Sequence, residues 1–414
     1  MTSAADEAGT PDKATPLMET GDMPGRAGRQ AEAEAEAGES ARSFLELVAA
    51  TGDGPSETAE APARPEAGKT FDARYGMQSG RPIIGSVFPV RSRITPDKTR
   101  CAAPEDFDRG RPRKTSWIPV GHALPYCWNF EGRRLLLTIH PEVAAILREP
   151  FLYGAQRKHA KVAAAIAMPH LDSLFGAHDP AASPIFVLSP GRTGSTLFNA
   201  LLGCVTSHAI SEPDTLTQLA AARAAQLSEI GIAGLHRLVW HSVSPFFHLP
   251  VEGNAGGDLA IKLRSNVNGL VPDILGAFPN ARYVLMLRDR LSWARSVFRV
   301  FRLTPVQAVA RLRLTLRMFA AVRAQNVRFT IVHYEEILAN PKLVLSRIAD
   351  RPLKDGTEAA INEIMKRDSQ SGSQVSRDHV GRGREEEAAW MQAFEAEWTR
   401  LRPAEAIEAL DISL

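Results

Sequence analysis

The stretch from Phe186 to Leu202, FVLSPGRTGSTLFNALL, constrains the fold most, because an apolar strand, a glycine-bearing turn and an apolar helix follow one another directly. Gly191 and Gly194 allow a tight turn. Ser195 and Thr196 offer hydroxyl and N–H groups where the helix begins, so an anion there would also meet the positive end of the helix dipole. The sequence therefore predicts a phosphate cradle.

The cradle differs from a nucleotide triphosphatase loop, GxxxxGK[ST], because Ser189 replaces the first glycine and Ser195 replaces the lysine. Its basic residue instead precedes the second glycine. This order resembles the 5′-phosphosulfate loop of sulfotransferases, whose core is [KR]-[ST]-G-[ST]-[ST]. The resemblance implies that 3′-phosphoadenosine 5′-phosphosulfate binds to Arg192, Thr193, Gly194, Ser195 and Thr196.

A second phosphate-binding element is predicted from Ala281 to Phe298, where an apolar strand, Tyr283 to Leu287, runs into a charged turn and a helix. Arg288 ends the strand and Ser296 follows eight positions later. In sulfotransferases an Arg and a Ser at this spacing bind the 3′-phosphate, for which Arg supplies a charged bidentate fork. An isolated turn of this kind would be a surface salt-bridged turn, but the two elements occur in the family's order.

A third element, Phe329 to Leu338 followed by Asn340-Pro341, is similar to the strand and YEDL-like segment of the same family, in which Tyr334 and Glu335 would have a structural role. Strands are thus predicted for Ile185–Leu188, Leu259–Leu263, Tyr283–Leu287 and Phe329–His333. Because helical patterns separate them, we expect an α/β fold with a parallel central sheet flanked by helices. Ligands bind at the carboxyl ends of such strands, where Arg192, Lys262 and Arg288 would converge.

Catalysis of sulfuryl transfer needs cations near the moving group and a base for the acceptor's proton. The resemblance implies that Lys262 and Arg192 supply the cations, although a lysine at a strand end can also extend from a sheet edge towards water. Cytosolic sulfotransferases carry a His two residues after that Lys, whereas this chain has Arg264.

The predicted base is Glu212, which follows the cradle helix as in some carbohydrate sulfotransferases. Pro213 would hold it outside helical geometry. Three alternatives stay open: His208 as the base, a base elsewhere in the chain that the sequence does not reveal, or Glu212 as a first-turn helix carboxylate with Asp214 competing as the cap.

Three regions are predicted: a disordered Ala/Glu/Pro-rich tail over residues 1–82, an extension or subdomain over 83–180, and the nucleotide-binding domain over 181–414. The tail offers a possible docking segment for a partner. Near the C-terminus, a polar basic segment over 368–384 is either a solvated loop or a lid over the nucleotide, carrying Arg377, Arg382 and Arg384.

The region 83–180 contains no residues at a spacing typical of a catalytic or metal-binding motif. Residues 117–139 have the composition of short strands, and 141–168 are helical in pattern with an Ala-rich end. The region is either an acceptor-binding subdomain or a structural extension that covers the sheet edge. Further along the chain, three aromatic residues form either an acceptor pocket or core: Trp240, Phe246 and Phe247.

The composition limits the ligands, metals and disulfides that this chain is expected to have, and its location. The formal net charge is +2, but the first 70 residues are acidic, so the remainder is basic and suits an anionic nucleotide. Three cysteines without paired spacing predict no metal and no disulfide. Without a signal peptide or a long apolar run, we expect a cytoplasmic protein with no transmembrane segment. No basic run with interleaved aromatics supports nucleic-acid binding.

Together these features predict a sulfotransferase that acts on a small-molecule, lipid or carbohydrate acceptor through a hydroxyl or amine. The alternatives are an inactive nucleotide-binding scaffold and a kinase-like phosphotransferase, the latter disfavoured by the missing P-loop lysine.

Overall fold

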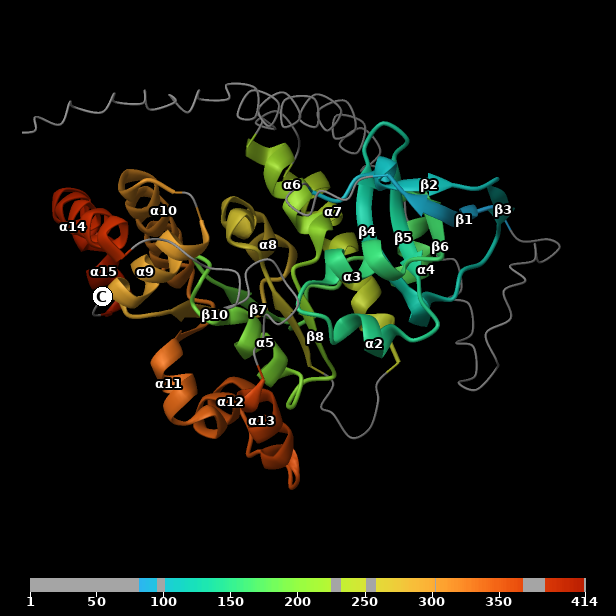
Figure 1. Ribbon diagram of the computed structural model, residues 1–414. Coiled ribbons are helices and arrows are strands. Elements are labelled where there is room, and N and C mark those ends of the chain that lie inside the picture. The colour runs from blue at the N-terminus through green and yellow to red at the C-terminus, as the bar shows by residue number, and fades with distance from the viewer. Residues whose placement is uncertain are drawn as a thin grey trace, which may run out of the picture.

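The structure is a computed structural model that describes residues 82–94, 101–224, 232–250, 258–301, 303–367 and 384–412. The predicted tail, residues 1–82, lies outside this part except for its last residue. Two sheets stand side by side in the molecule, one parallel and one antiparallel (Figure 1). The parallel sheet carries the predicted cradle.

All pairings in the parallel sheet are in register and parallel, as predicted. Its order is β11 (Arg328–His333), β10 (Arg282–Leu287), β7 (Ile185–Leu188), β9 (Leu259–Lys262) and β8 (His208–Ser211). Four of the strands match the expected segments within one residue. The edge strand β8 was not predicted, because its four residues, HAIS, lack a continuous apolar run.

Helices cover both faces of this sheet, which gives the expected three layers (Figure 1). Strand β7 shows how: Phe186 and Leu188 enter one core, whereas Ile185 and Val187 enter the other. The core on the first face includes residues of α6 (Asp214–Ala224), α7 (Ile232–Val243), α8 (Val271–Ala277), α9 (Arg290–Val300) and α10 (Pro305–Arg323). Two further helices, α14 (Arg384–Leu401) and α15 (Ala404–Leu410), extend this core by packing against α10. The second face packs against α5 (Ser195–Leu202), α11 (Tyr334–Ala339), α12 (Pro341–Ala349) and α13 (Thr357–Lys366).

The N-terminal region forms the antiparallel sheet. Its order is β2 (Phe107–Arg109), β1 (Gly85–Arg93), β6 (Val162–Ala167), β5 (Arg134–Ile139) and β4 (Ala123–Asn129), with β3 (Arg113–Thr115) also paired to β1. Three short helices accompany it: α2 (Val143–Leu147), α3 (Leu152–His159) and α4 (Leu171–Phe175).

The prediction of a continuous helical segment over 141–168 was wrong at its Ala-rich end. Ala163, Ala164 and Ala165 belong to β6, an interior strand between β1 and β5 that is buried over its central residues. Small side chains fit between the packed layers there, so tertiary packing overrides the helix propensity of alanine.

The two sheets share one hydrophobic core on the first face of the parallel sheet. Trp128 of β4 lies in that core and donates its indole N–H to Ser242 Oγ of α7 at 3.0 Å. The backbone N–H of Trp128 donates to Gln218 Oε1 of α6 at 2.7 Å. The antiparallel sheet is therefore fastened to helices α6 and α7, on the β8 side of the parallel sheet (Figure 1).

Candidate active site

The predicted cradle forms between β7 and α5 as a loop in which three of four consecutive residues have a positive φ. Gly191, Arg192 and Gly194 have φ values of 82°, 60° and 77°, in the left-handed region. A Cβ added at Gly194 would lie 2.2 Å from Tyr334 Cδ2, so the tyrosine ring occupies the space that a side chain would need. Gly194 is required both for its dihedral angle and for this close approach.

The loop is fastened to helix α9, which carries the second predicted element. The Trp293 indole N–H donates to the Gly191 carbonyl oxygen at 2.7 Å. Arg192 Nε donates to Ser296 Oγ at 3.0 Å. Two residues that the sequence assigned to separate phosphate sites, 104 positions apart, are thus in direct contact.

Arg288 follows β10 and stacks on Tyr334, with its guanidinium carbon 4.9 Å from the ring centroid. Its Nε atom is buried without a hydrogen-bond partner, and no carboxylate of the described residues pairs with it. Glu335, in the first turn of α11, accepts a hydrogen bond from the Asp289 backbone N–H at 3.3 Å, which ties α11 to the turn after β10. The guanidinium is therefore held in place but not neutralised, as an anion site requires.

Lys262 and Glu212 meet at the carboxyl ends of β9 and β8. Lys262 is 2% exposed and lies on an interior strand, so it is not a residue extending from a sheet edge. Its ammonium group donates to Glu212 Oε1 and lies 5.3 Å from the centre of the Phe151 ring. Glu212 has a φ of 57°, and its backbone N–H donates to the Lys262 carbonyl oxygen at 2.8 Å.

His208, the other residue considered as the base, lies at the opposite end of β8 from Glu212. It pairs with Leu259, the first residue of β9, whereas Glu212 follows the last pair, Ser211 with Lys262. Three strand steps of about 3.3 Å separate His208 from that last pair. The geometry therefore favours Glu212 over His208.

Asp214, considered as a helix cap, is a buried ion-pair partner instead. Its carboxylate is fully buried, accepts from Arg264 Nη1 at 2.7 Å and accepts from the Ala102 backbone N–H at 2.7 Å. Burial opposes the charge on Arg264, but Asp214, Tyr153 and Glu212 outweigh it and raise the pKa of the guanidinium. Arg264 Nε also lies 3.6 Å from Glu212 Oε2, so the residue that replaces the family's histidine contacts the predicted base.

Residues of the N-terminal extension enter this cluster, which the sequence did not reveal. The Tyr153 ring contacts two guanidinium groups, 4.6 Å from that of Arg264 and 5.6 Å from that of Arg157. Arg157 Nε donates to Asp106 Oδ2 at 3.2 Å. Phe151 and Tyr153 lie in a segment predicted to be helical, so only the fold shows that Phe151 contacts Lys262 and that Tyr153 contacts Arg264.

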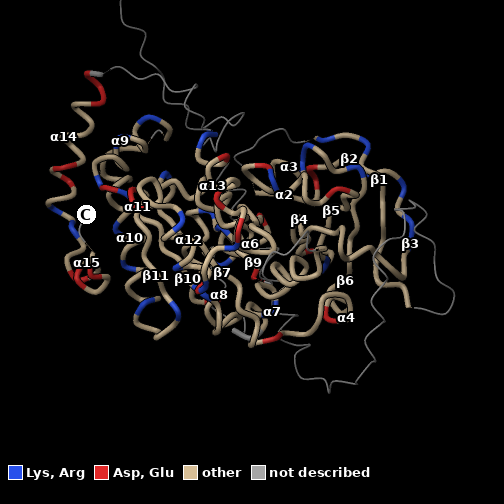
Figure 2. The backbone as a smooth tube through the Cα atoms, turned by 90° about the horizontal axis from the view of Figure 1, so that it is seen from below, with Lys and Arg blue, Asp and Glu red and all other residues tan. Residues whose placement is uncertain are grey.

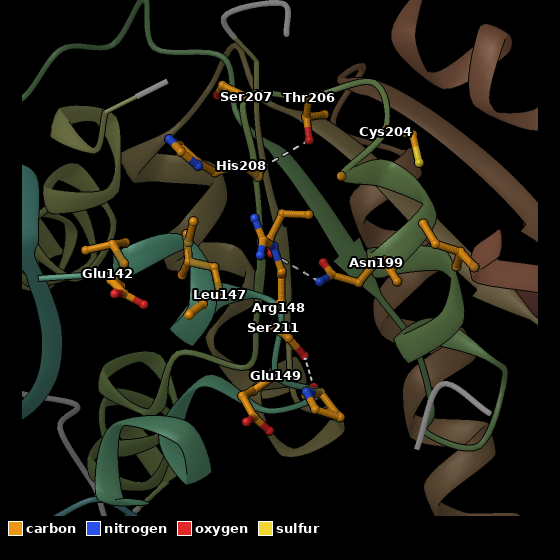
Figure 3. A pocket seen from close by; sticks show the side chains of 18 of the residues that line it. Glu142, Leu147, Arg148, Glu149, Asn199, Cys204, Thr206, Ser207, His208 and Ser211 are labelled. Atoms are coloured by element: carbon orange, nitrogen blue, oxygen red, sulfur yellow. Dashed lines mark hydrogen bonds between the residues drawn. The ribbon is translucent and has the colours of Figure 1, made fainter. Parts of the chain in front are cut away.

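A groove of about 910 Å³ runs along β8 between α2, α5 and α13 (Figure 3). Asn199 of α5 donates to the Ala209 carbonyl oxygen at 3.3 Å on one side, and Arg148 projects from the opposite side. At one end, Ser211 Oγ donates to the Pro150 carbonyl oxygen at 2.7 Å. Glu212 follows Ser211 in the chain, and Phe151 follows Pro150. The groove therefore ends beside the Lys262–Glu212 pair.

Of the three aromatic residues considered as an acceptor pocket or core, two belong to the core and the third, Phe247, is exposed. Trp240 and Phe246 are buried, and the Trp240 ring centroid is 5.4 Å from that of Phe278. The predicted lid falls largely outside the described residues: Arg377 and Arg382 lie in the gap, and Arg384 is the first residue of α14.

Within the described residues, no group of three or more His, Cys, Asp or Glu side chains is arranged to hold a metal ion. Nor is any helix of this part of the chain long and apolar enough to cross a membrane. Burial raises the pKa of the Cys204 thiol, which favours its protonated, unreactive form.

Comparison with known protein families gives one match, in which residues 184–351 fit the model of the sulfotransferase family. This segment belongs to the sulfotransferase family. It contains the cradle, Glu212, Lys262, Arg288 and Ser296. A search of curated protein sequences finds no match.

Solved sulfotransferase structures are among those similar to this chain. STF9 from Mycobacterium avium is 17% identical, with a TM-score of 0.39, over 60% of this chain and 80% of that one. STF1 from Mycobacterium tuberculosis H37Rv is 13% identical, with a TM-score of 0.33, over 53% and 76%. Retinol dehydratase, crystallised with androsterone and the inactive cofactor PAP, is 13% identical, with a TM-score of 0.28, over 59% and 84%. The family assignment rests on the matched segment and not on these structures.

Proposed function

We propose that the protein is a sulfotransferase that moves a sulfuryl group from 3′-phosphoadenosine 5′-phosphosulfate to a hydroxyl or amine acceptor. The hydrogen bond between Arg192 and Ser296 carries this proposal, because it joins the cradle to the second phosphate element. A kinase-like loop would need a lysine where Ser195 begins α5.

The donor would be bound at two places. The backbone N–H groups and hydroxyls of the cradle, with Arg192, would hold the 5′-phosphosulfate at the start of α5. Arg288 and Ser296 would hold the 3′-phosphate, since the Arg288 guanidinium lacks a carboxylate partner among the described residues.

The transfer would then follow from the Lys262–Glu212 pair. The acceptor oxygen or nitrogen forms a bond to sulfur, while the bond between sulfur and the 5′-phosphate oxygen breaks and adenosine 3′,5′-bisphosphate (PAP) leaves. Glu212 takes the acceptor's proton, and Lys262 with Arg192 stabilises the charge that develops on the sulfuryl and leaving oxygens. Phe151 limits water beside the ammonium group, which strengthens that electrostatic effect.

Calorimetric titration with PAP tests the donor site. We expect the wild-type protein to bind PAP in preference to ATP with magnesium, and the Arg288→Ala, Ser296→Ala double variant to lose at least about tenfold in affinity. The exposed Arg295 on the same helix provides the control, Arg295→Ala, which should bind normally. Preference for ATP would favour a phosphotransferase, and PAP binding without transfer to any acceptor would favour an inactive scaffold.

A further inference from the structure

A cation that the sequence analysis did not identify lies beside the cradle. Arg311 is on α10, a helix with four arginines and no acidic residue (Figure 2). Its guanidinium donates to Ser265 Oγ, and a Cβ added at Gly191 would lie 3.5 Å from Arg311 Nη2. The side chain therefore reaches the loop that precedes Arg192.

The position of Arg311 is fixed by packing. Thr315, one turn along α10, accepts a hydrogen bond from Asn268 Nδ2 at 3.2 Å and so joins the helix to the 3-10 turn Ser265–Leu270. The guanidinium carbon of Arg311 also lies 5.4 Å from the centre of the Phe301 ring. An arginine held in this way is preorganised for a ligand.

The charge of Arg311 is not neutralised by the protein. The other cations on this side of the cradle have acidic partners: Lys262 pairs with Glu212, and Arg264 pairs with Asp214. Among the described residues no carboxylate pairs with the half-buried Arg311, and its burial lowers the pKa of the guanidinium. A partly buried cation that contacts a hydroxyl and an aromatic ring but no carboxylate is costly unless an anion binds to it.

The sheet order indicates which substrate would supply that anion. Strand β7, which leads into the cradle, has β10 on one side and β9 on the other. Arg288 follows β10, so the 3′-phosphate is assigned to that side. Ser265 follows β9, beside Lys262 and the predicted base, and this side is left for the acceptor.

We propose that Arg311 and Ser265 bind an oxyanion group of the acceptor, so that the substrate is an acidic molecule with a hydroxyl or amine to be sulfated. This inference rests on the proposed function. The group is a carboxylate, or a phosphate or sulfate ester, because these accept paired hydrogen bonds from the guanidinium fork.

Calorimetry on the full-length protein saturated with PAP tests the subsite, with inorganic phosphate and malonate as separate titrants at low ionic strength. We expect at least one of the two ions to bind at one site. Stronger binding of phosphate would indicate a tetrahedral ester, and stronger binding of malonate a carboxylate. Arg311→Gln should weaken binding by about tenfold or more, and Arg311→Lys should restore part of it.

Arg313→Gln provides the matched control. Arg313 is on the same helix and is also half-buried, but two residues along a helix it points about 200° away. The Arg313→Gln variant should bind the ions as the wild-type protein does. Unchanged PAP affinity in Arg311→Gln would show that this variant is folded and that its donor site is intact.

If the wild-type protein binds PAP, three results would overturn the acceptor subsite alone. They are no affinity of the wild-type protein for either ion, equal ion affinity in Arg311→Gln and wild type, and a loss of PAP affinity in Arg311→Gln. Ion binding that survives Arg311→Gln but not Lys262→Ala would likewise overturn it, by placing the ion at the sulfuryl position. Failure of the wild-type protein to bind PAP would overturn the proposed function, and the acceptor subsite with it.

Discussion

The Lys262 ammonium group and the Glu212 carboxylate form an ion pair at the ends of two neighbouring parallel strands. The backbone N–H of Glu212 also donates to the Lys262 carbonyl oxygen, so backbone and side chain fix the same pair. Arg264 approaches the second carboxylate oxygen to 3.6 Å. The carboxylate thus lies between two cations, and an acceptor proton transferred to it would remain close to both.

Glu212→Gln keeps the shape of this side chain but removes its basicity. We expect PAP affinity within about threefold of wild type and a fall in sulfuryl transfer of about 10²- to 10⁴-fold. PAP release from the sulfated donor, measured with a panel of hydroxyl and amine acceptors, gives the rate. Glu142→Gln, in the groove, is the control, and a normal rate in Glu212→Gln would remove Glu212 from the mechanism.

Gly194→Ala tests the cradle. The new methyl group would meet the Tyr334 ring and would also have to adopt a φ of 77°, so the loop must move. We expect a loss of about 1–3 kcal/mol in unfolding free energy and at least tenfold weaker PAP binding. Gly154→Ala is the matched control, because a Cβ there meets nothing within 4 Å. Equal behaviour of the two variants in urea unfolding and calorimetry would contradict the role of Gly194.

The sequence predicted the parts of the site that are local. The strand β7, the loop and α5 are continuous in the chain, so the apolar run and its glycines were sufficient. The contact of Arg192 with Ser296, 104 positions apart, was not predicted, because it depends on how α9 packs beside the cradle. Arg264 was recognised as a departure from the family, but its partner Asp214 was considered as a helix cap, because the sequence could not show that α6 begins in a buried position.

The remaining parts depend on non-local packing. Phe151 and Tyr153 approach the Lys262–Glu212 pair because the antiparallel sheet packs on α6 and α7, and no spacing in the chain encodes that distance. Arg311 could not be identified from the sequence for the same reason, because it is one of four arginines on α10. Only the fold shows that it faces Ser265 and Gly191.

Asp214→Asn tests the link between the extension and the site. The substitution removes the negative charge from a buried carboxylate that pairs with Arg264 at 2.7 Å and lies 3.9 Å from Arg157. Two largely buried guanidinium groups would lose this partner, and we expect a loss of about 3–5 kcal/mol in unfolding free energy.

Urea unfolding measures this loss. Glu363→Gln is the control, because its ion pair with Lys366 is exposed on α13 and contributes at most about 1 kcal/mol. If Asp214→Asn were no less stable than Glu363→Gln, the buried pair would not hold the extension against the domain.

His140, which directly follows β5, is buried, and its titration is expected to make the stability of the protein depend on pH. The side chain is 3% exposed, and its Nε2 lies 2.9 Å from Thr138 Oγ1. Burial, with a smaller effect of His159, lowers the pKa of His140 from 6.5 to about 4. The unfolded chain therefore takes up a proton near pH 6.5, whereas the folded protein does so only near pH 4. The contribution of His140 to the unfolding free energy is complete above pH 6.5 and is lost as the pH drops to about 4, which lowers the unfolding free energy by up to about 3 kcal/mol.

His140→Gln removes that titration and keeps a polar side chain near Thr138. Other groups that titrate in this range act equally in both proteins, so the difference in unfolding free energy between wild type and variant isolates His140. We expect the wild-type advantage to shrink by about 3 kcal/mol between pH 7 and pH 4 in urea unfolding. Parallel stability curves for the two proteins would show instead that His140 takes up its proton in the folded protein as readily as in the unfolded chain.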